Sequence, residues 1–252
     1  MQAPRDDNAV KDYYDDWTAR YLESFGDIFQ AARAERDDDL IEHVVRMAGI
    51  EDGMRMLDAG CGVCGPSIRI ARIANVAIDA VTISPVQADL ARKRVQAAGL
   101  SDRITVHAAD FSDLATIFGP DRFDRIIFLE SLCHARRLDE VAEGCRDVLR
   151  HGGLVYVKDF YRKPYGDPAL RAWADAVIER VKEEFRLSVR DISEVCGALT
   201  RAGLEQDYCT KLGFDVSFAV SERFAETNRI DVYAGGQPID WGDWYDLAYR
   251  KR

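Results

Sequence analysis

The stretch that decides the fold is MRMLDAGCGVCGPSIRIAR, residues 54–72. A short apolar run ends at Asp58, and Gly60, Gly62 and Gly65 follow it in the spacing Gly-x-Gly-x-x-Gly. A strand, a glycine turn and a helix in this order predict a backbone that comes close to a ligand at the helix N-terminus. On its own the spacing fits a dinucleotide site as well as other cofactor sites, so the rest of the chain has to decide.

β-rich and helical segments alternate along the middle of the chain, beginning at this turn. The alternation predicts a doubly wound α/β domain, in which a mostly parallel sheet has helices on its faces. The expected strands are residues 55–58, 78–83, 104–108, 123–129 and 153–160. The expected helices are residues 66–74, 85–98 and 139–149, and the HGG sequence at 151–153 is expected to end the last of them.

Further segments flank this series on both sides. Aromatic residues recur at near-helical intervals early in the chain, so residues 1–48 are predicted to form an N-terminal helical cap and residues 49–252 the main domain. The closing DWYDLAYRKR, residues 243–252, is expected to be a last strand inserted beside a strand at 204–211, which brings the sheet to seven strands. Residues 170–186 and 191–202 are expected to be helices.

The composition narrows the function classes. The chain of 252 residues carries 34 Lys and Arg against 44 Asp and Glu, a net charge of -10, without a block of basic residues. This charge disfavours sequence-independent binding to nucleic acid or to an anionic membrane. The opening MQAPRDDNAVKDYY lacks the apolar core of a secretory signal, and no apolar run approaches a membrane span. We therefore expect a cytoplasmic protein with a small-molecule partner, as a monomer or a homo-oligomer.

Six cysteines are scattered along the chain without the regular spacing of a disulfide framework, so we expect reduced thiols. Cys61 and Cys64 have the Cys-x-x-Cys spacing of zinc knuckles and redox-active turns. The nearest later cysteine is Cys133, so a second pair that would complete a zinc site is missing. We therefore interpret the two thiols as structural filler and expect no metal ligand among them.

The neighbours of the glycine turn argue against a dinucleotide. A dinucleotide site usually has an acid at the end of the second strand, about 20 residues after the turn, to bind the ribose hydroxyls. This chain has Thr82 and Ser84 there instead. Asp58 lies beneath the turn, where a carboxylate can bind turn amides or help to hold a cationic ligand but would repel a pyrophosphate.

The turn LDAGCGVCG, residues 57–65, resembles motif I of class I S-adenosylmethionine-dependent methyltransferases. VTISPVQADLARKRVQAAGLSDRITVHAADF is similar to the second-strand and third-strand region of that family, and FDRIIFLESLCHA and VLRHGGLVYVKDF to its fourth and fifth strands. The resemblance covers about residues 13–160 and implies a Rossmann-like fold. Within the family, the chain is most similar to the isoprenoid C-methyltransferases, which act on sterols and geranyl diphosphate, and more distantly to cyclopropane fatty acid synthases.

The resemblance implies S-adenosylmethionine as the cofactor. The cofactor contacts that it implies are Asp58, Gly60 and Gly62 at the methionine part, Thr82, Ser84 and Gln87 at the ribose, and Asp110 and Phe111 at the adenine. Thr82 departs from the pattern, because many class I members carry an acid there. Asp110 can also be explained as the cap of a following helix.

Glu130 and His134 are the candidate catalytic residues. Glu130 ends an apolar strand at the carboxyl edge of the sheet, where ligands bind in this architecture. The resemblance implies that an alkene takes up the methyl group, and that Glu130 stabilises the resulting carbocation and removes a proton. His134 shares this role or orients the substrate. Two alternatives stay open: Glu130 as a salt-bridged strand end, and His134 as a histidine satisfied by the backbone.

Six further residues are candidates for binding the methyl acceptor. The cap residues Tyr14 and Trp17 are expected to line the acceptor pocket and Phe25 the core, although packing is the commoner role of such an aromatic stripe. The full candidate set is Tyr14, Trp17, Tyr21, Asp159, Tyr161 and Arg162. A strand-end aspartate such as Asp159 also often only caps a turn.

The sequence therefore predicts C-methylation of an alkene carbon in an isoprenoid, either a prenyl diphosphate or a sterol-like terpenoid. A diphosphate substrate would bring Mg²⁺ as a second cofactor. One alternative is a small-molecule O- or N-methyltransferase of natural-product biosynthesis, which His134 supports, because a histidine near this position deprotonates hydroxyls in related O-methyltransferases. An alternative of another class is a catalytically inactive regulatory protein that binds the cofactor.

Overall fold

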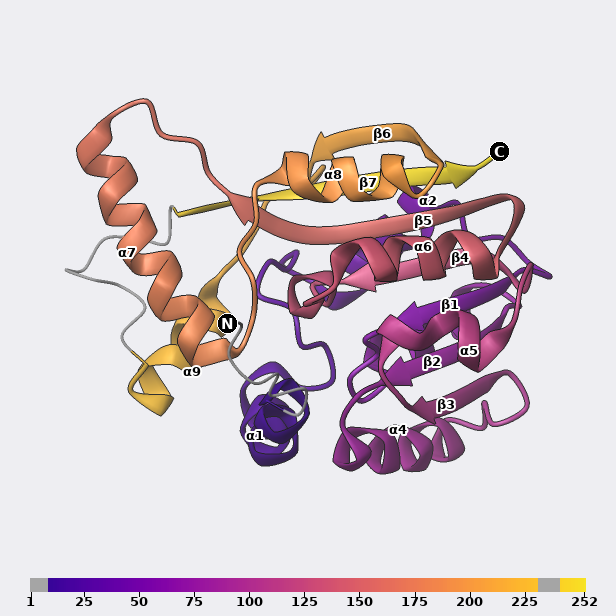
Figure 1. Ribbon diagram of the computed structural model, residues 1–252. Helices are drawn as coiled ribbons and strands as arrows, with labels where there is room; N and C mark the ends of the chain where they lie inside the picture. The colour runs from indigo at the N-terminus through magenta and orange to yellow at the C-terminus, as the bar shows by residue number, and fades with distance from the viewer. Residues whose placement is uncertain (1–8, 231–240) are drawn as a thin grey trace.

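A seven-stranded sheet with the order β3-β2-β1-β4-β5-β7-β6 forms the centre of the computed structural model, which describes residues 9–230 and 241–252 (Figure 1). The strands are β1 (Arg55–Ala59), β2 (Ala77–Thr82), β3 (Ile104–Ala108), β4 (Phe123–Leu129), β5 (Leu149–Arg162), β6 (Leu204–Lys211) and β7 (Gly242–Lys251). The first five strands are parallel, and β7 runs antiparallel between β5 and β6. The doubly wound, mostly parallel sheet predicted from the sequence is confirmed.

Helices cover both faces of the sheet. They are α1 (Ala9–Phe25), α2 (Asp37–Ala48), α3 (Gly65–Ile73), α4 (Pro85–Ala97), α5 (Leu114–Phe118), α6 (Leu138–Val148), α7 (Pro168–Phe185), α8 (Ile192–Arg201) and α9 (Ala219–Asn228), with 3₁₀ turns η1 (Phe111–Asp113) and η2 (Leu132–His134). Alternate residues of β1 enter different cores: Met56 packs with α2 and α3, and Leu57 with α6 and α8. Because both faces are buried, the central strands are almost wholly apolar.

Three helices gather at the carboxyl edge of the parallel strands. In Figure 1 the arrows of β1 to β5 point toward the side where α1, α7 and α9 lie. α1 packs against α4 and α9. The side chains between these helices and the sheet form a third apolar cluster, which is rich in aromatic rings and includes Tyr21, Phe160, Phe224 and Trp244. This cluster encloses the edge at which ligands bind in open α/β sheets.

The sequence prediction was wrong at the HGG sequence. α6 ends at Val148, and β5 begins at the next residue, so residues 151–153 lie inside a strand. Leu149 pairs with Phe123 but Leu154 pairs with Arg125, so the glycines occupy a register shift. A Cβ atom at Gly153 would lie 2.8 Å from a backbone oxygen, which explains the glycine there. Helices α5 and α9 were not predicted.

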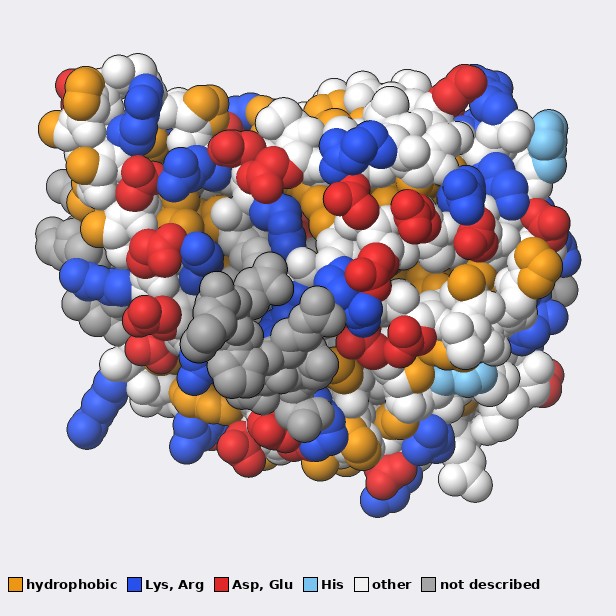
Figure 2. Space-filling model, in the orientation of Figure 1, with side chains coloured by type: hydrophobic (Ala, Val, Ile, Leu, Met, Phe, Trp, Pro, Cys, Tyr) orange, Lys and Arg blue, Asp and Glu red, His pale blue; other side chains and the backbone are white. Residues whose placement is uncertain are grey.

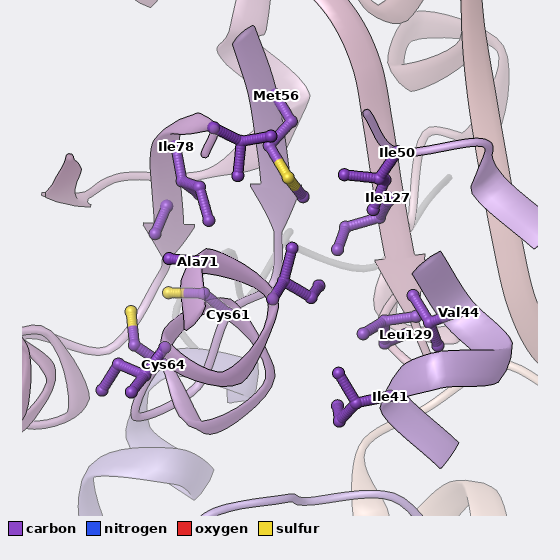
Figure 3. Packing of buried hydrophobic residues seen from close by; sticks show 14 of the residues in the cluster. Ile41, Val44, Ile50, Met56, Cys61, Cys64, Ala71, Ile78, Ile127 and Leu129 are labelled. Atoms are coloured by element: carbon purple, nitrogen blue, oxygen red, sulfur yellow. The ribbon is translucent and has the colours of Figure 1, made fainter. Parts of the chain in front are cut away.

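The two cysteines of the glycine turn are core residues. Figure 3 shows the side chains of Cys61 and Cys64 beside Ala71 and Ile78 on one side of the apolar cluster. Both thiols are buried, and all six cysteines of the chain are free. Across residues 9–230 and 241–252, no group of three or more His, Cys, Asp or Glu side chains could hold a metal ion. The packing fits the interpretation of these thiols as filler.

Charges of both signs are mixed on the surface of the protein. Acidic and basic side chains are interspersed over the face shown in Figure 2. No helix in the described part of the chain combines the length and the apolar character needed to cross a membrane.

Candidate functional site

A cavity of about 530 Å³ lies at the carboxyl edge of the sheet. Nine residues singled out from the sequence share its wall: Tyr14, Gly60, Gly62, Thr82, Gln87, Asp110, Phe111, Glu130 and His134. They come from the cap helix and from the ends of four neighbouring strands. The parallel sheet therefore brings together segments that lie up to 120 residues apart, such as Tyr14 and His134.

The glycine turn that follows β1 needs its glycines for close approach. Gly60 has a φ of +98°, and a Cβ atom there would lie 2.3 Å from the Cβ atom of Ser131. At Gly65 a Cβ atom would lie 1.9 Å from the backbone oxygen of Asp27. The turn can therefore lie directly against Ser131, the residue before η2, and against the loop that joins α1 to α2, residues 26–36.

Asp58 lies buried beneath this turn, as predicted. Its carboxylate accepts a 2.6 Å hydrogen bond from the Ser67 hydroxyl. Burial raises the pKa of Asp58 to about 6, although the Ser67 hydrogen bond lowers it. A cation bound beside the carboxylate would favour its charged form.

Gln30 shares a small space of about 30 Å³ with Asp58, Gly60 and Gly62, and the sequence interpretation missed it. Its side chain is buried, and neither Nε2 nor Oε1 has a hydrogen-bond partner among the described residues. A primary amide can donate to a carboxylate and accept from an ammonium. Gln30 and Asp58 therefore fit the amino acid end of the expected cofactor. The only signal in the sequence is an isolated glutamine in the apolar stretch IFQAA.

The residues expected at the ribose divide into two groups. Gln87 lines the cavity and accepts a 2.8 Å hydrogen bond from the Thr82 hydroxyl, while its buried Nε2 has no partner within residues 9–230 and 241–252. This leaves a donor for a ribose hydroxyl. Ser84 instead caps α4, because it accepts from the Gln87 backbone N–H and donates to Asp15 at 2.5 Å. Ser84 therefore joins α1 to α4 and does not line the cavity.

The adenine candidates lie at the start of η1. Asp110 accepts a 2.7 Å hydrogen bond from the Ser112 backbone N–H, so it caps η1 while it lines the cavity. Phe111 also lines the cavity, with its ring edge-on to Phe128. Asp110 uses one carboxylate oxygen to cap η1, and its other oxygen can accept from the adenine. The cap explanation and the cofactor explanation of Asp110 are therefore compatible.

Cofactor affinity is expected to fall at acidic pH because of Asp58. Below pH 6 the buried carboxyl takes up a proton, and a cationic ligand then loses its counter-charge. The dissociation constant of S-adenosylhomocysteine should therefore rise by up to about tenfold per pH unit below pH 6. Calorimetric titration between pH 5 and 8 checks this. Asp58→Asn should bind more weakly, by about 1–3 kcal/mol, with a flat profile over this range. An equally steep profile in Asp58→Asn would assign the effect to another group.

A second cavity, of about 120 Å³, adjoins the first. The two share four residues of their walls: Tyr14, Phe29, Glu130 and His134. Aromatic rings make up most of the remaining wall, among them Tyr21, Phe25, Phe160, Phe224, Trp241 and Trp244. A space of this kind excludes water and suits an apolar ligand.

Glu130 lies at the junction of the two cavities in an unusual backbone conformation. Its φ is +53°, in the left-handed region that a glutamate rarely occupies. The carboxylate accepts hydrogen bonds from the backbone N–H groups of Ala31 at 2.6 Å and Ala32 at 3.2 Å. It also forms a 2.5 Å ion pair with the buried ammonium of Lys158. Backbone strain of this kind persists where the surrounding structure holds it, often at functional sites.

His134 lies in η2 and is neutral. Its Nδ1 lies 3.1 Å from the Arg186 carbonyl oxygen, which can only accept, so we assign the proton to Nδ1. Nε2 then accepts from the Tyr14 hydroxyl at 2.9 Å. Burial lowers the pKa of His134 to about 4, so the ring carries no charge at pH 7. The Nε2 atom therefore offers a lone pair at the junction of the cavities.

Four predicted acceptor-binding residues lie outside both cavity walls. Trp17 stacks on Tyr13, with ring centroids 5.6 Å apart, and it is not among the residues that line either cavity. Tyr161 belongs to the core beneath α6 and α8, because alternate residues of β5 face opposite sides of the sheet. Arg162 pairs with Asp175 of α7.

The fourth of these residues, Asp159, supports the backbone of η2. It accepts hydrogen bonds from the backbone N–H groups of Cys133 at 3.0 Å and Phe160 at 2.9 Å. Burial raises the pKa of Asp159 to about 7. Phe25, expected in the core, is buried and packs there, and it also lines the second cavity.

The fold and the turn geometry define a class I methyltransferase fold of the kind that binds S-adenosylmethionine. The model of the mycolic acid cyclopropane synthetase family matches residues 15–187, and the chain belongs to this family. The resemblance seen in the sequence is confirmed at the level of the family.

Curated relatives include several methyltransferases. The methyltransferase GfsG of Streptomyces halstedii is 30% identical over 68% of this chain, and the match covers 60% of the relative. The 27-O-demethylrifamycin SV methyltransferase of Amycolatopsis mediterranei is 31% identical over 76% of the chain and 68% of the relative. Sterol methyltransferase-like 3 of Botryococcus braunii is 34% identical over 50% of the chain, and here the match covers only 31% of the relative.

Solved structures share the fold over most of the chain. The [4+2]-cyclase SpnF superposes with a TM-score of 0.81 at 21% identity, over 100% of this chain and 97% of the other. The geranyl diphosphate C-methyltransferase of Streptomyces coelicolor A3(2), in complex with Mg²⁺, geranyl diphosphate and S-adenosyl-L-homocysteine, gives a TM-score of 0.67 at 17% identity, over 86% of this chain and 79% of the other. These likenesses confirm the architecture.

Proposed function

We propose that the chain transfers the methyl group of S-adenosylmethionine to an alkene carbon of an isoprenoid, which is a prenyl diphosphate or a sterol-like terpenoid. The observation that carries this proposal is the aromatic second cavity, which meets the cofactor cavity at a carboxylate, Glu130. Aromatic faces stabilise a cation by roughly 0.5–2 kcal/mol each when water is excluded. Relatives that are named for sterol methylation support the same acceptor class. A diphosphate would bring Mg²⁺, as in the geranyl diphosphate complex.

The residues of the chain take separate parts in this reaction. When bound, S-adenosylmethionine supplies a methyl group on a sulfonium. Asp58 and Gln30 hold its amino acid end, and Gln87 a ribose hydroxyl. The rings of the second cavity hold the apolar acceptor and exclude water that would quench a carbocation. Glu130 places a carboxylate where the two cavities meet, and this carboxylate accepts the proton that the methylated acceptor loses.

O-methylation is a second candidate, because of the state of His134. A neutral imidazole with Nδ1–H anchored on a backbone carbonyl leaves Nε2 as an acceptor, as a base for a hydroxyl needs. A hydroxyl of the acceptor would take the place of the Tyr14 hydroxyl at Nε2. The name of the rifamycin relative includes an O-demethyl substrate, which supports this candidate.

One experiment separates the two candidates. The protein is incubated with S-adenosylmethionine labelled in the methyl group and with a panel of isopentenyl, geranyl and farnesyl diphosphates, sterols and phenols, with and without Mg²⁺. Mass spectrometry locates the label. A product with a new carbon–carbon bond supports the first proposal, whereas a labelled methyl ether supports the second. A label that stays on the cofactor with every acceptor would contradict both and favour a regulatory role.

A further inference from the structure

Lys158 is a lysine buried completely in the protein, to which the sequence assigned no role. It is 0% exposed and lies near the end of β5. Its Nζ lies 2.5 Å from Glu130 Oε1 and donates to the Ala32 carbonyl oxygen at 2.8 Å. Removing an ammonium from water is costly, and it persists only when the charge is paired and its protons are bonded. Because this desolvation is costly, we expect Lys158 to have a function other than packing.

Glu130 and Lys158 form hydrogen bonds with two adjacent residues of the 26–36 loop. The carboxylate accepts from the N–H groups of Ala31 and Ala32, and the ammonium donates to the carbonyl of Ala32. The ion pair therefore satisfies backbone donors and an acceptor at one point of the loop. The loop has no regular secondary structure over most of its length, so these side chains supply bonds that a helix or strand would otherwise supply.

Ala31 and Ala32 come directly after the part of the loop that lines the cofactor cavity. Phe29 lines both cavities, and Gln30 lies with Asp58 beneath the glycine turn. A shift of Ala31 would move both side chains, since they are its immediate predecessors. The position of the loop therefore decides whether the wall around the cofactor is complete.

We infer that Lys158 is a positioning residue, which acts through Glu130 to keep the 26–36 loop closed over the cofactor cavity. The inference goes beyond the proposed reaction, because it does not depend on which acceptor is methylated. Without the ammonium, Glu130 would be an uncompensated buried charge and would turn toward water. The loop would then lose three hydrogen bonds together.

The test compares two lysines of similar chemistry. Lys158→Met removes the ammonium at similar volume. Lys251→Met is the matched control, since Lys251 also donates to a carboxylate, Asp121, and to a carbonyl, Leu149, but at the end of β7 away from both cavities. In Lys158→Met we expect amide hydrogen exchange at residues 29–32 to quicken, and S-adenosylhomocysteine to bind more weakly, each by about tenfold. In Lys251→Met both should stay as in the unmodified protein.

Two further variants keep the test decisive if Lys158→Met folds poorly. Lys158→Arg retains the charge and should restore most of the protection and affinity. The double variant Lys158→Met/Glu130→Gln removes both charges, while the glutamine oxygen can still accept from the loop, so it should be closer to the unmodified protein than Lys158→Met. If exchange and affinity in Lys158→Met match those of Lys251→Met, or if the double variant is the worse one, the inference is wrong. Neither readout needs an acceptor.

Discussion

Replacing Glu130 with glutamine is expected to lower kcat by about 10²–10⁴-fold. The amide keeps the shape of the side chain, and its oxygen can still accept from the loop. It cannot accept a proton, and it brings no negative charge to a carbocation. The measurement is the initial rate of label transfer, with the acceptor identified from the panel, normalised to the concentration of sites that bind S-adenosylhomocysteine.

The control for this variant is His134→Ala, which should cost less if Glu130 is the base. Glu130→Asp should lie between, since it keeps the charge but withdraws the carboxylate from the cavity junction. Glu130→Gln leaves Lys158 without its counter-charge, so the double variant Lys158→Met/Glu130→Gln is needed as well. It should recover cofactor affinity but not turnover. A greater loss in His134→Ala than in Glu130→Gln would favour O-methylation.

Removing residues 1–25 is expected to leave a folded protein with little methyl transfer. The cut deletes α1 and with it the rings of Tyr14, Tyr21 and Phe25, which line the second cavity. Losing three rings around a desolvated cation costs about 1.5–6 kcal/mol, or roughly a 10- to 10⁴-fold loss of rate, and the entry of water adds to it. The rate of label transfer measures the loss, and circular dichroism checks the fold.

The truncation ends at residue 25 so that the loop after α1 is retained. Phe29 and Gln30 lie beside the cofactor spaces, so a longer truncation would also remove cofactor contacts. With the loop retained, affinity for S-adenosylhomocysteine should fall by less than about tenfold. Trp17→Phe is the matched point variant, because Trp17 lies on α1 but outside both cavity walls, and its rate should be nearly unchanged. Full activity in the truncated protein would show that α1 only packs.

The strands could be predicted well because their signal is local. β3 and β4 have the predicted bounds, since the second half of β4 is a continuous buried apolar run and the edge strand β3 alternates buried with exposed residues. The glycines at 152 and 153 were misjudged for the same local reason. A glycine pair after a helix usually marks its end, whereas here it accommodates a register shift against β4, which depends on a partner strand.

The candidate site residues that could be predicted from the sequence are those that come directly after the end of a strand. Glu130 and His134 lie at one junction, as their place after β4 implied. The ion pair of Lys158 and the role of the loop could not be found this way, because Glu130 and Ala31 are 99 residues apart. On β5 the prediction chose Asp159 and Tyr161, but Phe160 lines the second cavity and Lys158 pairs with Glu130, a difference of one residue that reverses the face of a strand.

The shared wall of the two cavities has a consequence for inhibitor design. Because the two spaces adjoin at Tyr14, Phe29, Glu130 and His134, an adenosyl group and an apolar chain joined by a short linker could occupy both at once. Tethering two weak binders makes the second contact intramolecular, with an effective concentration that reaches about the millimolar range for short linkers. Such a bisubstrate compound would bind more tightly than either half. The chain length at which affinity stops rising would measure the depth of the aromatic cavity.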